Sequence, residues 1–208
     1  MSEFETEDQQ VEDLKKWWKE NGKAVIVGAV LGFGAIFGGR MYMDHQEKLR
    51  VEASIGFERM NMAVQQQQSG MALSQADQIV ANYPGTVYAS LASLAMARMH
   101  VDKGELAAAQ NRLQWVMDHE EQEDIVHVAR LRLARVLFAD AKLDQALALL
   151  ATMDVAAYES IYQELRGDIY LAKQQPDQAR TAYTAALGAL DEKDDRQLLQ
   201  MKLDDLGA

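Results

Sequence analysis

The chain has 208 residues, a net charge of -11, 2 prolines and no cysteine. This length suits one ordinary domain with an appendage, and so few prolines among many alanines, leucines and glutamines favour helices over a β-sandwich. The negative charge repels phosphate backbones and argues against nucleic acid as a partner, while the lack of cysteine excludes disulfides, thiolate metal sites and cysteine nucleophiles.

An uncharged run, AVIVGAVLGFGAIFGG, extends from Ala24 to Gly39, with Lys23 before it and Arg40 after it. If Arg40 snorkels, the helix continues to Met43 and matches the bilayer core of about 30 Å. The acidic residues that precede the run and the poor cleavage context after it favour a retained anchor over a cleaved signal or a buried core helix. We therefore expect a cytoplasmic acidic and amphipathic segment at 1–23 and a transmembrane helix at 24–43.

Positive charge is unequal on the two sides of this span. The ten residues before it hold four lysines, whereas residues 40–49 hold one arginine and one lysine. Positive residues stay on the cytoplasmic side, so the sequence predicts a cytoplasmic N-terminus and a translocated C-terminal domain.

Two tryptophans, Trp17 and Trp18, precede the span where amphipathic rings prefer the headgroup layer. Apolar residues at helical spacing with lysines between them suggest that residues 12–21 lie along the membrane surface. Asn21 and Gly22 would then form a break between this surface helix and the span.

Small residues recur on one side of the span. Their spacings of 4, 3 and 4 place them on one helix face, where a second membrane helix can approach closely. The simpler alternative is that glycine is common in membrane helices. The residues of this predicted packing face are Gly28, Gly32, Ala35 and Gly39.

Three later stretches align on alanines separated by 37 and 33 residues, with a small residue twelve positions before each alanine and a turn between. This pattern predicts antiparallel helix pairs whose small residues lie where the helices cross. The predicted packing residues are Ala97, Ala109, Ala134, Ala146, Gly167, Tyr170, Ala179 and Tyr183.

The repeats resemble the tetratricopeptide family over roughly residues 85–190, and the third copy matches best. The predicted fold is therefore all-α, with one transmembrane helix and then a tetratricopeptide-like solenoid of helical hairpins at 44–208. Its repeats are expected at roughly 53–85, 90–123, 127–158 and 160–192, with a capping helix at 195–206 over the last apolar face.

No sequence motif points to catalysis, a cofactor or a metal. His119 and His127 flank an acidic stretch, but eight residues separate them, which does not suit a metal pair on adjacent turns. We expect both to be solvated loop or helix-start residues, and His100 to be a partly buried core residue. The predicted function is therefore non-enzymatic.

On the tetratricopeptide register, the first helices of the repeats line a concave face. An apolar lining with arginines suits a partner segment, whose carboxylate or carbonyl the arginines would bind. The alternative is that these residues form core beneath the long helix that ends near Val64. The candidate groove residues are Leu91, Leu94, Arg98, Val128, Leu131, Arg135, Phe138, Glu164 and Asp168.

The whole chain resembles the family of ancillary SecYEG translocon subunits, the YfgM family. The segments that carry the resemblance are ENGKAVIVGAVLGFGAIFGGR (20–40), YPGTVYASLASLAMA (83–97), LRLARVL (131–137), LRGDIY (165–170) and QMKLDDL (200–206). No single one of them is specific, but together with the degenerate repeats they cover nearly the full chain.

This resemblance implies a single-pass protein of the bacterial inner membrane whose repeat domain lies in the periplasm. It implies association with the SecYEG translocon and with a PpiD-like membrane-anchored periplasmic chaperone, and a role as an adaptor that passes translocated proteins to periplasmic chaperones. The alternative is a membrane-tethered regulatory scaffold, whose cytoplasmic segment contacts a response regulator and controls an envelope stress response.

Overall fold

The computed structural model of the protein describes residues 3–151, 157–191 and 196–207, with side chains from Gln10 onward. Within these residues the chain forms nine helices and no strand, so the predicted all-α class is confirmed. The chain divides into two compact units, Met1–Val51 and Glu52–Ala208.

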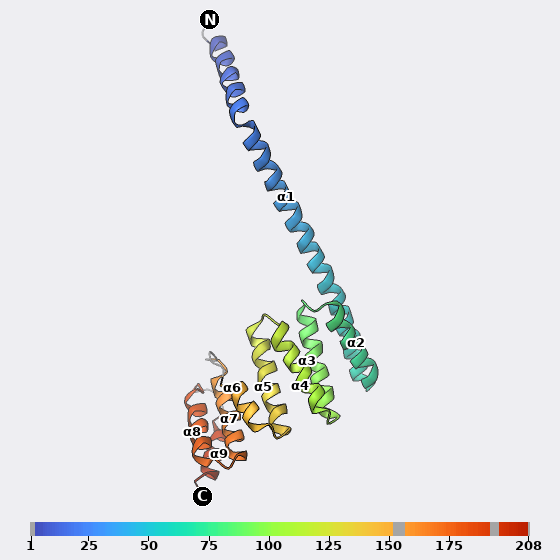
Figure 1. The fold of residues 1–208 in the computed structure, drawn as a ribbon, viewed down its shortest axis with the longest axis vertical. Coiled ribbons are helices and arrows are strands. Elements are labelled where there is room, and N and C mark those ends of the chain that lie inside the picture. The colour runs from blue at the N-terminus through green and yellow to red at the C-terminus, as the bar shows by residue number, and fades with distance from the viewer. Residues whose placement is uncertain (1–2, 152–156, 192–195, 208) are drawn as a thin grey trace. The chain divides into compact units, whose positions relative to one another are not determined.

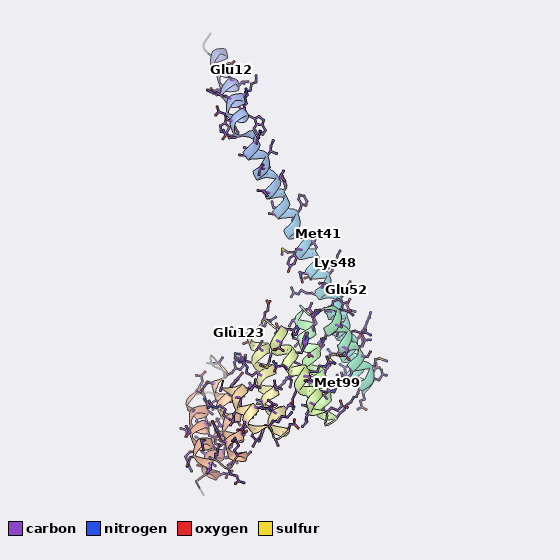
Figure 2. All side chains as sticks on the ribbon, in the orientation of Figure 1. Glu12, Met41, Lys48, Glu52, Met99 and Glu123 are labelled. Atoms are coloured by element: carbon purple, nitrogen blue, oxygen red, sulfur yellow. The ribbon has the colours of Figure 1, made fainter. Side chains whose placement is uncertain are left out.

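The first unit consists of the N-terminal part of α1 (Glu3–Gln65) (Figure 1). α1 is the one helix of the described residues that is long and apolar enough to cross a membrane, and none of its most apolar window is buried. Figure 2 shows its side chains pointing outward around the labelled Met41, which is 78% exposed. A bilayer is the solvent in which such a surface is stable.

The predicted break at Asn21 and Gly22 is wrong, because α1 runs through both residues. Gly22 is buried beneath the indole ring of Trp18, where a Cβ would lie 3.2 Å from the ring. The side-chain amide of Asn21 donates a hydrogen bond of 3.1 Å to the carbonyl oxygen of Trp17. One glycine inside a helix costs only about 1 kcal/mol, and these contacts between successive turns offset part of that cost.

The second unit is a stack of helical hairpins, in which successive helices from α2 to α9 pack in chain order (Figure 1). The last residues of α1 contribute to its first core. The other helices are α2 (Ser69–Asn82), α3 (Val87–Asp102), α4 (Leu106–His119), α5 (Glu123–Ala139), α6 (Leu143–Leu150), α7 (Glu159–Ala172), α8 (Pro176–Gly188) and α9 (Gln197–Asp205).

Four hairpins share one turn geometry. Gln67, Gly104, Ala141 and Gln174 adopt positive φ values of 58°, 75°, 56° and 59°. The residue after each donates its N–H to a carbonyl five residues earlier at 2.9 Å, as in the Schellman motif. Each left-handed residue lies five positions before a fully buried alanine, so the hairpin α1–α2 repeats the geometry of the three hairpins after it.

The core of each hairpin contains that alanine and a complementary pair of side chains. The alanines are Ala72, Ala109, Ala146 and Ala179, all with 0% exposure. Of the residue twelve positions before each alanine and the residue four positions after it, one is large and the other small. The four pairs are Met60 and Ala76, Ala97 and Leu113, Ala134 and Leu150, and Gly167 and Tyr183.

Candidate functional site

A basic pocket of about 340 Å³ lies between α3 and α5. Its walls come from two successive first helices of the hairpins, and α4 contributes one floor residue. Among the residues that the structure describes, aliphatic side chains and arginines line it, and no acidic side chain does. The lining residues are Leu94, Ala97, Arg98, Val101, Leu113, Arg132, Arg135 and Val136.

The three arginines of this pocket differ in their partners. The Nε of Arg98 donates to both carboxylate oxygens of Asp102, at 2.9 and 3.1 Å. Arg132 and Arg135 are exposed on successive turns of α5, and neither makes an ion pair within the part of the chain that the structure describes. The pocket therefore carries two positive charges that no carboxylate of the described chain neutralises.

The structure separates the nine candidate groove residues into three groups. Leu94, Arg98 and Arg135 line the basic pocket. Leu131 is only 5% exposed and belongs to the largest core cluster. Leu94 belongs to the same cluster and also lines the pocket. Half-buried side chains that pack against the same cluster are Leu91, Val128 and Phe138.

Glu164 and Asp168 form the third group, and the capping helix α9 already binds them. The Nζ of Lys202 lies 2.7 Å from a carboxylate oxygen of each. The hydroxyl of Tyr183 also donates to Asp168 at 2.7 Å. The two acidic residues of the candidate groove therefore already have partners within the chain.

These contacts shift the pKa values of Lys202 and Tyr183. Burial lowers the pKa of Lys202, but hydrogen bonds and attraction to Asp168 and Glu164 outweigh burial, and the net shift is upward. Burial is the main cause that raises the pKa of Tyr183, and the hydrogen bond to Asp168 adds to it. Both groups therefore hold their protons more tightly in the folded domain than in the unfolded chain.

The histidines have specific neighbours that the sequence did not predict. The ring of His127 stacks on Tyr158 with centroids 4.6 Å apart, and its Nδ1 lies 2.9 Å from the hydroxyl oxygen of Tyr162. The expectation of a solvated helix-start residue is therefore wrong for His127, which is half-buried. His119, at the end of α4, is exposed and stacks on Trp115.

His100 is half-buried at the end of α3, as its repeat position predicts, and its Nδ1 lies 2.6 Å from a carboxylate oxygen of Glu105. Within the described residues, no group of three or more histidine, aspartate or glutamate side chains is placed to hold a metal ion. The described contacts of His100, His119 and His127 are thus with aromatic rings, a tyrosine hydroxyl, a single carboxylate and the backbone carbonyl oxygen of Trp115, which lies 2.9 Å from the Nδ1 of His119.

The small residues of the span lie on open helix surface. A Cβ built on Gly28, Gly32 or Gly39 would meet no heavy atom within 4 Å, and Ala35 is exposed on the same face. Trp17 and Trp18, about two turns before the apolar run, are 50% and 51% exposed. This surface can therefore accept a neighbouring helix or lipid without change to the fold.

The sequence matches the family model of the tetratricopeptide repeat-like domain over residues 15–208. It is 34% identical over 206 residues to the ancillary SecYEG translocon subunit of Escherichia coli (strain K12), with 99% of each chain covered. It is 31% identical over 200 residues to the protein of the same description from Haemophilus influenzae, with 96% of this chain and 97% of the relative covered. The protein so described from Neisseria gonorrhoeae is 32% identical over 206 residues, at 96% and 97% coverage. No solved structure matches the chain significantly.

Proposed function

Because the chain belongs to the family of ancillary SecYEG translocon subunits, with a tetratricopeptide repeat-like domain, we propose that it is a non-catalytic membrane-anchored adaptor of the translocon. The observation that carries this proposal is the end-to-end match, which includes both the apolar part of α1 and the helical repeats. In this function α1 anchors the protein beside the translocon, and the repeat domain contacts other proteins.

Physical chemistry supports the anchoring role of α1. Large apolar side chains such as Leu31, Phe33 and Phe37 are between 63% and 68% exposed on it. Transfer of each such side chain out of water is worth about 1.5–3 kcal/mol, so insertion of this stretch into a bilayer is strongly favourable.

The repeat domain is proposed to act on the periplasmic side of the inner membrane. There it would hold a PpiD-like membrane-anchored chaperone close to the translocon, and proteins that emerge would pass to periplasmic chaperones. The excess of lysine before the span supports this orientation, and the uncompensated arginines of the basic pocket offer a surface for a partner.

Single cysteines at exposed positions test the orientation, because the chain has no cysteine of its own. In cells with a permeabilised outer membrane, we expect a membrane-impermeant maleimide to label Gln78→Cys in α2. Gln10→Cys should be labelled only after the inner membrane is opened. Equal labelling of both cysteines, or the reverse pattern, would contradict a cytoplasmic N-terminus.

Affinity purification from membranes in mild detergent tests the association with the translocon. The tagged chain should recover translocon subunits, and Gly32→Leu should lower their recovery several-fold, because the leucine side chain keeps a partner helix away from the small-residue face. Gly34→Leu is the matched control: it lies about 160° around the helix from Gly32, and both positions are open. Equal recovery with both variants would show that the small-residue face is not a contact.

A further inference from the structure

The basic pocket is unusual in its charge. The chain as a whole has a net charge of -11, yet three arginines line the pocket, and no carboxylate of the described residues does. Since Arg98 is already bonded to Asp102, the uncompensated charge lies on Arg132 and Arg135 of α5. This is a local positive site on an acidic protein, and it attracts anionic groups.

The positions of Arg132 and Arg135 indicate what kind of anion they bind. Residues three apart on a helix are neighbours, so two arginines at this spacing repel one another when no anion lies between them. A guanidinium group presents a planar set of donors that matches a carboxylate, which it binds through two parallel hydrogen bonds. An anion at this place replaces repulsion by attraction.

The floor of the pocket adds a second requirement. Leu94, Ala97, Leu113 and Val136 are aliphatic and buried, and Val101 stands at the rim with 36% exposure. Such a floor takes an apolar side chain from water. The occupant must therefore present carboxylates and apolar side chains together, as a stretch of polypeptide does.

Full neutralisation of both uncompensated guanidinium groups takes two negative charges, one more than a lone chain terminus brings. A terminal α-carboxylate supplies one negative charge, but two guanidinium groups of the pocket lack a partner. Two carboxylates are supplied by aspartate or glutamate side chains within an acidic stretch, with apolar residues beside them.

We propose that the basic pocket binds an acidic, apolar segment of a protein partner. Two of its carboxylates bond to Arg132 and Arg135, and a neighbouring apolar side chain lies on Leu94 and Val136. This assignment rests on the proposed adaptor function, since it states which surface of the repeat domain meets the partner.

A binding measurement on the full chain in phosphatidylcholine nanodiscs tests the proposal. The probe is a short fluorescein-labelled peptide with two aspartates among leucines, and its counterpart has lysines in place of the aspartates. We expect fluorescence anisotropy to show binding of the acidic peptide alone, weaker at high salt. The double substitution Arg132→Gln, Arg135→Gln should raise its Kd about tenfold or more.

Two further variants separate a specific site from general attraction. The pair Arg50→Gln, Arg59→Gln removes the same charge from exposed positions of α1 and should leave the Kd unchanged. Val101→Glu keeps every arginine but places a carboxylate at the rim, so it should weaken binding as well. Equal effects of the two arginine pairs would overturn the proposal, as would binding of the lysine peptide. Displacement of the acidic peptide by phosphatidylglycerol vesicles would overturn it too, because the pocket would then bind a lipid headgroup.

Recovery of translocon subunits with the wild-type chain distinguishes this proposal from the adaptor function. If the subunits are recovered but the acidic peptide does not bind, the pocket assignment is wrong and the adaptor function stands. If the subunits are not recovered, the adaptor function fails, whatever the peptide does.

Discussion

Substitution of Gly167 by alanine is expected to lower the free energy of unfolding of the repeat domain by about 1–3 kcal/mol. The new Cβ would lie 2.4, 2.5 and 2.9 Å from three ring carbons of Tyr183, which is only 1% exposed. A rigid buried ring cannot yield without disturbing the core around it. Helix propensity alone predicts the opposite sign, since alanine is favoured over glycine by about 1 kcal/mol in a helix.

A double-mutant cycle with Tyr183→Leu isolates this clash. With leucine at 183, as at the equivalent positions Leu113 and Leu150, Gly167→Ala should become neutral or stabilising. Gly188→Ala is the control, because its Cβ meets no atom of the described residues within 4 Å. Urea unfolding of the full chain in detergent, followed by circular dichroism, gives each free energy. If Gly167→Ala behaves like Gly188→Ala, the steric account is wrong.

Substitution of Lys202 by methionine is expected to have a comparable effect, about 1–3 kcal/mol at neutral pH. The change leaves Glu164 and Asp168, which are neighbours on α7, without their shared cation. The side chains of these three residues are between 25% and 32% exposed, so the loss is smaller than for a fully buried ion pair.

Neutralisation of the two carboxylates tests whether their uncompensated charge causes the loss of stability in Lys202→Met. Adding Glu164→Gln and Asp168→Asn to Lys202→Met should restore much of the lost stability, because no uncompensated charge then remains at the cap. If the triple variant is no more stable than Lys202→Met alone, the loss comes from packing of α9 and not from charge.

The effect of Lys202→Met should also depend on pH. The pKa values of Lys202 and Tyr183 are raised above their ordinary values of 10.5 and 10.0. The stability that such groups contribute is fully present below the pKa of the unfolded chain and is lost as pH rises through the folded value. The difference between wild type and Lys202→Met should therefore be constant from pH 7 to about pH 9 and decrease above about pH 10.

The helical class and the apolar span could be predicted because both follow from local patterns of about twenty residues. The left-handed turn residues were harder to predict, since only Gly104 among the four is a glycine. Gly167 and Tyr183 could each be recognised from the sequence as a repeat position. That a small residue at one position accompanies a large residue at the other, and that Met60 and Ala76 have the opposite order, is apparent only in the packed structure.

The site was harder to predict, because its residues come together only through tertiary packing. Arg98 and Arg135 occupy positions that face the concave side in the tetratricopeptide register, and Arg132 does not. All three nevertheless line the pocket between α3 and α5. Glu164 and Asp168 fit the concave register, but Lys202, at least 34 residues later, binds them. His127 meets Tyr162 across 35 residues, a distance at which periodicity gives no signal.

Site-specific photo-crosslinking in intact cells tests the adaptor account most directly. A photoreactive residue at Gly32 should form adducts with translocon subunits, and one at Arg135 should form adducts with a periplasmic chaperone. A third probe at Glu12 serves as the comparison. If neither Gly32 nor Arg135 yields these adducts while Glu12 captures a cytoplasmic regulator, the adaptor account is contradicted and the protein is better explained as a regulatory scaffold.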